Sequence, residues 1–172
     1  AASSVYWALL ESEREFERIF EETSRMIYSL GMRLFRNEED AQDFIQDVYL
    51  EAYRKRERYQ GRSRYSTYLY SLALHYGLNR IRKRKLDFEL LDEATTAAPE
   101  EEAPPEGDPS VVREELGLLP EVYRLPIVLH YYEKMSIARI AESLDQNENT
   151  VKSYLHRGRK ILKQKIEQRK QS

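Results

Sequence analysis

The chain of 172 residues contains no cysteine, which excludes disulfides, cysteine-ligated zinc and a thiol nucleophile. No apolar run approaches the ~18 residues that a membrane-spanning helix needs. Residues 1–15 have no basic start and turn acidic at once, so they do not resemble a secretory signal. A phosphate-binding GxxxxGK(S/T) sequence is also missing. We therefore expect no membrane insertion, and the missing cysteines are compatible with a reducing, cytoplasmic location.

Charge is plentiful but unevenly distributed. The net charge is −2, yet residues 87–110 hold nine acidic residues and no lysine or arginine. That segment carries −9, so the rest of the chain carries +7. Its four prolines and many alanines are typical of a flexible or extended linker, which the acidic charge either keeps solvated or directs to a basic groove. The overall charge therefore does not argue against a nucleic-acid partner.

Helical spacing of apolar residues predicts helices over about 5–36, 39–58 and 66–85, before this linker. Gly31, inside the first of them, indicates a kink or a close helix contact. Asn37 begins a break that caps the second helix. The predicted buried face of the second helix consists of Phe44, Ile45, Val48, Tyr49 and Ala52. We expect residues 1–86 to form one helical domain.

Acidic residues follow one edge of the second helix. Asp40, Asp43, Asp47 and Glu51 are spaced so that they share a side. Three interpretations stay open: a solvated face, the carboxylate cluster of a metalloenzyme, and a docking edge for a basic partner. The metal site is the least favoured, because no histidine or other close carboxylate completes it.

The third helix combines aromatic and basic residues. It follows a polar loop at 59–65, and five of the six residues at 80–85 are basic, more than helix capping needs. Aromatic rings among cations hold unstacked bases, at roughly 1–3 kcal/mol per stacked base. Some of the 13 tyrosines must instead belong to the core. We expect Tyr65 and Tyr68 to be exposed and functional, and Tyr76 to be a packing residue.

After the linker, residues 111–172 predict a second helical domain. A short helix over 110–116 precedes one over 121–134, in which Pro126 is tolerated or causes a kink. Two further helices lie on either side of the turn at 145–147, and the second is rich in bases and runs to about Gln168. This arrangement is typical of a helix-turn-helix DNA reader. The alternative is a helical hairpin with a solvated basic face.

Several motifs together resemble the extracytoplasmic-function (ECF) sigma factors of the sigma-70 family. DAQDFIQDVYL at 40–50, YSTYL at 65–69 and IRKR at 81–84 are similar to sigma region 2. LPEVYR at 119–124, the SxxxIA pattern at 136–141, TVKS at 150–153 and HRGR at 156–159 are similar to region 4. The resemblance covers about residues 24–85 and 111–165. It implies an all-α fold of two small helical domains, 1–86 and 111–172, joined by the acidic linker 87–110.

The resemblance also implies three sets of site residues. Docking on the β′ clamp helices of RNA polymerase is expected of Asp40, Asp43, Gln46 and Asp47. Binding of the melted −10 strand is expected of Arg62, Arg64, Tyr65, Tyr68, His75, Asn79, Arg80 and Lys83. Binding of the −35 duplex in the major groove is expected of Thr150, Lys152, Ser153, His156, Arg157, Arg159 and Lys160. No catalytic residue, cofactor, metal or small-molecule substrate is expected.

The partners implied by the resemblance are core RNA polymerase (β′ clamp helices and β flap), promoter DNA and an anti-sigma factor. A stand-alone helix-turn-helix regulator is the alternative function, although it leaves the first 85 residues without a role. Some positions depart from the family pattern. Tyr68 replaces a usual Trp, Asn79 a frequent Asp, and Asn149 a frequent Gly. Asp145 occupies the usual glycine of the turn, so we expect a positive φ there.

Overall fold

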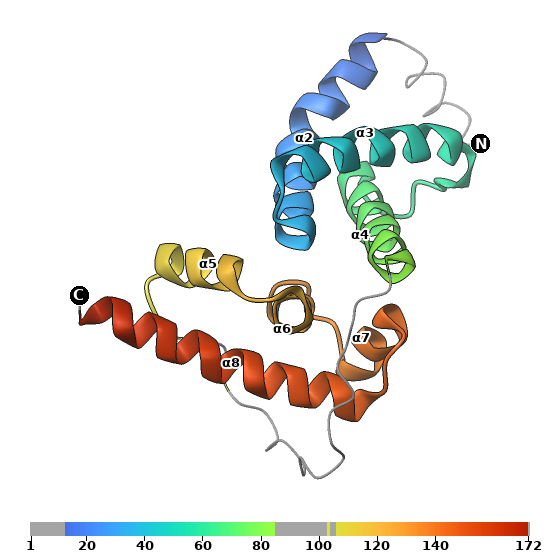
Figure 1. Cartoon of the computed structure of the whole chain (residues 1–172). Helices are drawn as coiled ribbons and strands as arrows, with labels where there is room; N and C mark the ends of the chain where they lie inside the picture. The colour runs from blue at the N-terminus through green and yellow to red at the C-terminus, as the bar shows by residue number, and fades with distance from the viewer. Residues whose placement is uncertain (1–12, 85–102, 104–105, 172) are drawn as a thin grey trace. The chain divides into compact units, whose positions relative to one another are not determined.

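The computed structural model describes residues 13–84, 103 and 106–171, and within these ranges it contains helices and no β-strand, as predicted. The chain divides into two compact units, residues 1–80 and 81–172. Most of the predicted linker, residues 87–102, 104 and 105, lies outside the described residues, as do the first residues of the helix predicted over 5–36. Figure 1 shows the order of the helices within each unit.

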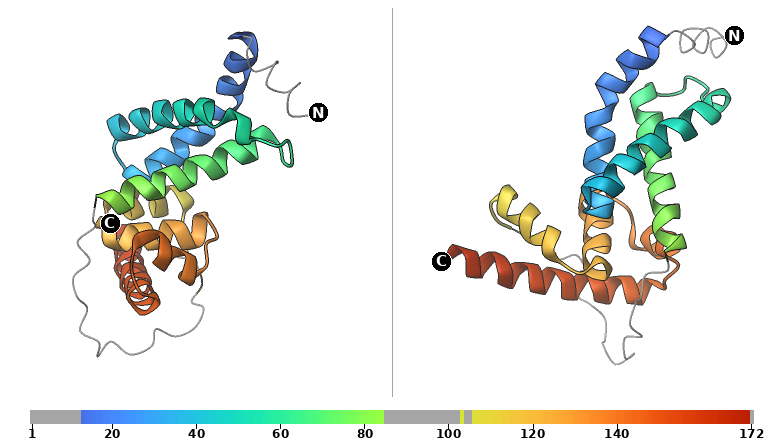
Figure 2. Two further views of the ribbon diagram at one scale, coloured as in Figure 1. Left: turned by 90° about the vertical axis from the view of Figure 1, so that its right-hand side faces the viewer. Right: turned by 45° about the horizontal axis from the view of Figure 1, so that its top comes forward.

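The first unit consists of α-helices with a short 3₁₀ turn between the last two, and Figure 2 shows them from two further directions. They are α2 (Glu13–Phe35), α3 (Glu38–Arg54), η1 (Arg56–Arg58) and α4 (Tyr65–Lys83). Helix α2 packs along α3. Helix α3 therefore ends four residues earlier than predicted, because the chain tightens into η1.

Phe44 is the centre of this unit. Its side chain is fully buried between glycines of the two flanking helices, Gly31 in α2 and Gly77 in α4. A Cβ at Gly31 would lie 2.9 Å from Phe44 Cδ1, and one at Gly77 would lie 3.2 Å from Phe44 Cε2. The close-contact alternative predicted for Gly31 is thus confirmed. Ile45, which was predicted to be buried, is half-buried, and Ala41 takes its place in the core.

The start of α3 follows from its sequence. Asn37 has an extended backbone and accepts hydrogen bonds at Oδ1 from the amides of Glu39 (2.9 Å) and Asp40 (3.2 Å). This satisfies amide groups that have no partner inside the helix. The three acidic residues of the first turn also suit the positive end of the helix dipole. The predicted break and cap are confirmed.

The second unit is organised along its last helix, which packs against the helices that precede it. Its elements are α5 (Pro109–Leu118), α6 (Glu121–Ile127), η2 (Val128–Tyr132), α7 (Ile137–Leu144) and α8 (Glu148–Lys170). The helix predicted over 121–134 changes at Val128 into a π-helix, with the Glu133 amide bonded to the Val128 carbonyl at 3.1 Å. Pro126 has no amide hydrogen to continue the α-helical pattern at its own position.

The turn between α7 and α8 has the predicted geometry. Ser136 caps α7 by accepting from the Arg139 amide at 3.3 Å. Asp145 ends α7 with φ 55° and ψ 47°, so the positive φ expected there is confirmed. Asn147 then caps α8 by accepting from the Thr150 amide at 2.7 Å. One short turn between two capped helices forms the helix-turn-helix.

Candidate functional site

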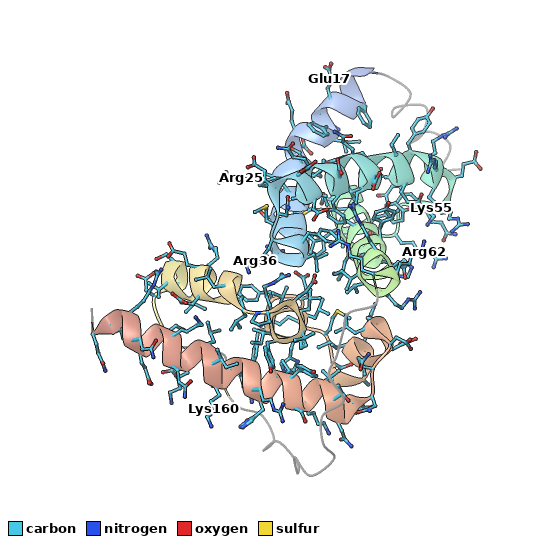
Figure 3. The ribbon with its side chains drawn as sticks, in the orientation of Figure 1. Glu17, Arg25, Arg36, Lys55, Arg62 and Lys160 are labelled. Carbon is cyan, nitrogen blue, oxygen red and sulfur yellow. The ribbon has the colours of Figure 1, made fainter. Side chains whose placement is uncertain are left out.

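One side of α8 faces away from the helices on which it packs. Its buried side consists of Val151, Tyr154, Leu155, Gly158, Leu162 and Ile166. Asn149, Ser153, His156 and Lys160 follow one another at intervals of four, three and four residues, so they line the opposite side. Lys160 is exposed, and its side chain points away from α6 in Figure 3. This row is polar or basic along its length, as a helix that enters a DNA groove requires.

Two predicted −35 residues already have bonds within the protein. The Thr150 hydroxyl donates to Asn147 Oδ1 at 2.9 Å, as part of the α8 cap. Arg159 Nη1 donates to the hydroxyl of Tyr131 in the π-helix η2. Tyr131 was not among the residues predicted from the sequence, because it lies 28 residues before Arg159 in the chain. Lys152 and Arg157 are half-buried on the two flanks of the row.

On α4, three of the predicted −10 residues share one face. Tyr68, His75 and Asn79 are seven and four residues apart, which places them on one side of the helix. His75 is exposed, and its Nε2 lies 3.0 Å from Asn79 Nδ2. Arg62 and Arg64 are exposed in the loop before α4. Arg62 lies at the same end of the unit as Lys55 (Figure 3).

The tyrosines at the start of α4 form a cluster. The ring centroid of buried Tyr59 lies 5.2 Å from that of Tyr65 and 5.1 Å from that of Tyr68, and the last two are 5.9 Å apart. The expectation that Tyr65 and Tyr68 are exposed was wrong, because both pack on Tyr59 and are half-buried. Burial raises the pKa of Tyr65 to about 12. Their rings are therefore packed into the surface of the unit and do not project into solvent.

Arg80 is a predicted −10 residue whose guanidinium faces acidic side chains of α3. Its guanidinium pairs with two predicted polymerase-docking residues, at 3.3 Å from Asp40 Oδ1 and 3.6 Å from Asp47 Oδ2. The Tyr76 hydroxyl donates to the same Asp47 oxygen at 3.0 Å. Burial, and then the bond to Asp47, raise the pKa of Tyr76. Its half-buried ring lies 6.3 Å from that of Phe44, in agreement with the packing role predicted for it.

The outward face of α3 combines polar and apolar side chains. Asp43 and Gln46 are exposed, as a docking edge requires. Next to them along the helix, Leu50 is 54% exposed and Tyr53 59% exposed. The Arg56 guanidinium lies 4.4 Å from the centre of the Tyr53 ring. Leu50 and Tyr53 were not among the residues predicted from the sequence, although both are apolar residues outside the predicted buried face.

The carboxylates of α3 do not gather into a metal centre. Within residues 13–84, 103 and 106–171 there is no group of three or more histidine or carboxylate side chains placed to hold a metal ion. The described helices also include none that is long and apolar enough to cross a membrane. The interactions of Asp40 and Asp47 with Arg80 give these carboxylates a role that needs no metal.

Comparison with known proteins matches both units. The family model described as "Sigma-70 region 2" matches residues 19–86, and the one described as "Sigma-70, region 4" matches residues 111–162. These matches and the helix-turn-helix define the class as a sigma-70-type transcription initiation factor. The chain is 30% identical over 154 residues to the ECF RNA polymerase sigma factor SigW of Bacillus subtilis (strain 168), covering 81% of this chain and 82% of SigW. The chain belongs to the ECF sigma factor family.

Other relatives agree with this assignment. The ECF RNA polymerase sigma factor SigE of Mycolicibacterium smegmatis is 29% identical over 144 residues, which cover 80% of this chain and 56% of SigE. Among solved structures, the sigma factor RpoE of Bartonella quintana, crystallised with the anti-sigma factor NepR, has the same fold. Its TM-score is 0.51 at 17% identity, with 90% of this chain and 98% of that chain covered. A stand-alone regulator is not favoured, since it leaves the region 2 match without a role.

Proposed function

We propose that this chain is the promoter-specificity subunit of a bacterial RNA polymerase. In this role it binds core polymerase, recognises the −35 and −10 elements and promotes initiation without being a catalyst itself. The observation that carries the proposal is the presence, in one chain, of a region 2 unit and a region 4 unit that each have a separate surface suited to nucleic acid. A cytoplasmic location follows from the partner, core RNA polymerase.

The outward face of α3 is the proposed docking surface for the β′ clamp helices. Asp43 and Gln46 supply exposed polar groups, and Leu50 and Tyr53 supply exposed apolar area beside them. A basic amphipathic helix fits such a surface, because cations meet the carboxylates while apolar side chains cover Leu50 and Tyr53. The second unit would contact the β flap, and family membership suggests an anti-sigma factor that covers these surfaces.

The proposed −10 site is the face of α4 that carries Tyr68, His75 and Asn79. A base that leaves the duplex could stack on the tyrosine cluster and form hydrogen bonds with the histidine and the amide. Arg62, Arg64 and Lys83 are exposed and suited to the phosphates on either side. Stacking at roughly 1–3 kcal/mol per base is comparable to the cost of unstacking one, so strand capture requires no nucleotide hydrolysis.

The proposed −35 site is the polar row of α8. Ser153 and His156 lie in the first half of the helix, where recognition helices meet base edges. Lys152, Arg157 and Lys160 surround them and are suited to phosphates. Thr150 and Arg159 act mainly within the protein, by capping α8 and by joining it to η2.

The proposal is tested with the full chain, core polymerase and a promoter library. We expect the labelled chain to bind core and to support run-off transcription from a subset of promoters that share both elements. Failure to bind core at low salt would disprove the proposal. A chain that binds core but gives no transcript from any promoter would contradict the assigned DNA sites.

Variants then assign the surfaces. Asp43→Arg should weaken core binding about tenfold without changing the melting temperature, because Asp43 is exposed and is one of the three carboxylates of the docking face. Glu167→Arg, an equal charge change on the exposed side of α8, is the control.

Lys160→Ala should lower −35 affinity for all sequences and reduce the salt slope by about one, whereas His156→Ala should alter the choice among sequences.

A further inference from the structure

Arg80 lies where helices α2, α3 and α4 meet. It belongs to α4, its guanidinium bridges Asp40 and Asp47 of α3, and it lies 5.3 Å from the centre of the Phe35 ring of α2. Tyr76, one turn earlier on α4, holds Asp47 Oδ2 from a second direction. The carboxylates of the docking edge are therefore partly neutralised from within the unit.

This cluster is accessible to solvent. The Arg80 side chain is 26% exposed, and those of Asp40 and Asp47 are 30% and 43% exposed. An incoming cation can reach the same carboxylate oxygens without unfolding the unit. Glu39 and Asp43 are exposed on the same helix and, among the described residues, take no part in the cluster. The acidic edge thus consists of a part held by Arg80 and a part that is not.

We propose that Arg80 is an internal competitor for the basic residues of the polymerase. In the free chain it occupies the two carboxylates that a cation of the partner would bind. Docking transfers Asp40 and Asp47 to the partner and releases the guanidinium of Arg80, next to the nucleic-acid face of α4. This inference rests on the proposed function, because it takes core polymerase to be the basic partner.

The exchange is nearly balanced in energy, since one partly exposed set of ion pairs replaces another. Such pairs contribute little each, so the competition should change core affinity only by about two- to fivefold. The main effect of the competition is on the choice of partner, because a neutral or acidic surface cannot displace Arg80 from the carboxylates. The two binding events are linked reciprocally. If docking on polymerase raises the affinity of the chain for nucleic acid by freeing Arg80, bound nucleic acid raises the affinity for polymerase by the same factor.

The first experiment measures core binding of the full chain at low and high salt. Arg80→Gln should bind core about two- to fivefold more tightly at low salt, and the gain should fade as salt screens the carboxylates. Arg84→Gln, an equal charge change on an exposed residue of the same segment, is the matched control and should give less than half of the gain. Unchanged or weaker core binding by Arg80→Gln overturns the proposal.

The second experiment needs no polymerase, so it separates this inference from the proposed function. Affinity of the free chain for a labelled single-stranded −10 oligonucleotide is measured for Asp40→Asn/Asp47→Asn and for Glu39→Gln/Asp43→Asn, which remove the same charge. The first pair should bind more tightly and raise the salt slope by about one more than the second, because only it frees Arg80.

Adding Arg80→Gln should abolish that difference. Equal gains from the two pairs, or a gain that persists without Arg80, would mean that total charge and not the cluster is responsible. Melting temperatures are measured alongside. If the double variant unfolds, Asp40→Asn is compared with Glu39→Gln as single variants, and Asp40→Asn should give a smaller gain that again requires Arg80.

Discussion

At the scale of single residues, Gly158 sets how closely α8 approaches α6. A Cβ at this position would lie 2.9 Å from Ile127 Cδ1, 3.1 Å from Tyr123 Cβ and 3.3 Å from the Tyr123 carbonyl oxygen. Gly→Ala inside a helix ordinarily stabilises by up to ~1 kcal/mol. Here the crowding should reverse the sign, so we expect Gly158→Ala to lower the free energy of unfolding by about 1–3 kcal/mol.

Chemical denaturation followed by circular dichroism measures this change. Gln164→Ala, on the exposed side of the same helix, is the control and should have little effect. A Gly158→Ala protein at least as stable as the wild type would show that Tyr123 and Ile127 move aside at no cost.

The buried phenol of Tyr65 should make the free energy of unfolding depend on pH in the alkaline range. Burial raises its pKa to about 12, from the value of 10.0 expected for an exposed tyrosine. A raised folded-state pKa means that the neutral ring stabilises the fold fully below about pH 10. This contribution is lost as the pH rises from there through about 12. Tyr65→Phe should therefore lose less stability than the wild type between these two pH values.

Denaturant titrations from pH 9 upward, in steps of about one pH unit, measure the difference. Tyr53→Phe, at a ring that is 59% exposed, is the control and should follow the wild-type curve. Parallel curves for Tyr65→Phe and the wild type would mean that Tyr65 does not govern this range.

Residue-level features were predictable from sequence where they depend on local backbone. The capping by Asn37 follows from a side chain that accepts from nearby amides. The positive φ of Asp145 follows from a residue type that tolerates the left-handed conformation. The partial burial of Tyr65 and Tyr68 was not predictable in this way, because it depends on their contacts with Tyr59. The intervening loop brings Tyr59 against both rings, and the Tyr59 hydroxyl donates to the Ser63 carbonyl within that loop.

At the scale of elements, the start of α8 depends on one side chain. Asn147 Oδ1 accepts from both the amide and the hydroxyl of Thr150. Asn147→Ala should therefore lower the free energy of unfolding by about 0.5–2 kcal/mol. It should also weaken −35 duplex binding, because the first turn of α8 frays. Asn147→Asp, which keeps an acceptor at the positive end of the helix, should retain most of both properties.

The measurements are denaturation and fluorescence anisotropy with a labelled duplex. Asn149→Ala, two residues on and outside the cap, separates the two effects: it should leave stability unchanged. If Asn147→Ala were as stable as the wild type, water would be replacing the cap.

The elements themselves followed from apolar spacing, and the differences have local causes. Helix α3 ends at Arg54 because the chain tightens into η1, and no glycine or proline near Lys55 predicts this end from the sequence. The change from α6 to η2 does have a signal, Pro126. A proline predicts a disturbance of the helix, but it does not determine whether the chain kinks or widens into a π-helix.

At the scale of the whole molecule, charge segregation predicts a salt effect on DNA binding. The segment 87–110 carries −9 and is covalently joined to the rest of the chain, which carries +7. Replacing Glu100, Glu101 and Glu102 by glutamine should tighten non-specific duplex binding about two- to tenfold at low salt, because less negative charge accompanies the chain to the DNA. The gain should vanish at about 0.5 M salt, where the Debye length is only a few ångströms.

Electrophoretic mobility shifts or anisotropy with a non-promoter duplex measure this gain. Thr95→Ala/Thr96→Ala changes the same segment without changing its charge and should have no effect. A gain that survives high salt would point to a cause other than electrostatics.

The sequence predicted which residues belong to each candidate site. It could not predict that a residue of one site forms an ion pair with a residue of another. Tyr68, His75 and Asn79 share a face because of helical spacing alone. Arg80, one residue after Asn79, was assigned to the same set, yet it pairs with Asp40, which is 40 residues earlier. Only the packing of α4 on α3 brings these charges together, and no local pattern encodes it.

Phe44, Gly31 and Gly77 share one fixed volume among three helices, and this limits how the unit can diverge. A larger side chain at Gly31 has no room while the ring is present, and a smaller residue at 44 leaves a cavity that glycine cannot fill. At Gly77 a Cβ would first meet Leu34 Cδ1, at 2.6 Å. A single change at any of these positions is therefore costly. Related chains reach a different interior most readily by paired changes, in which position 44 shrinks as position 31 grows, or position 34 shrinks as position 77 grows.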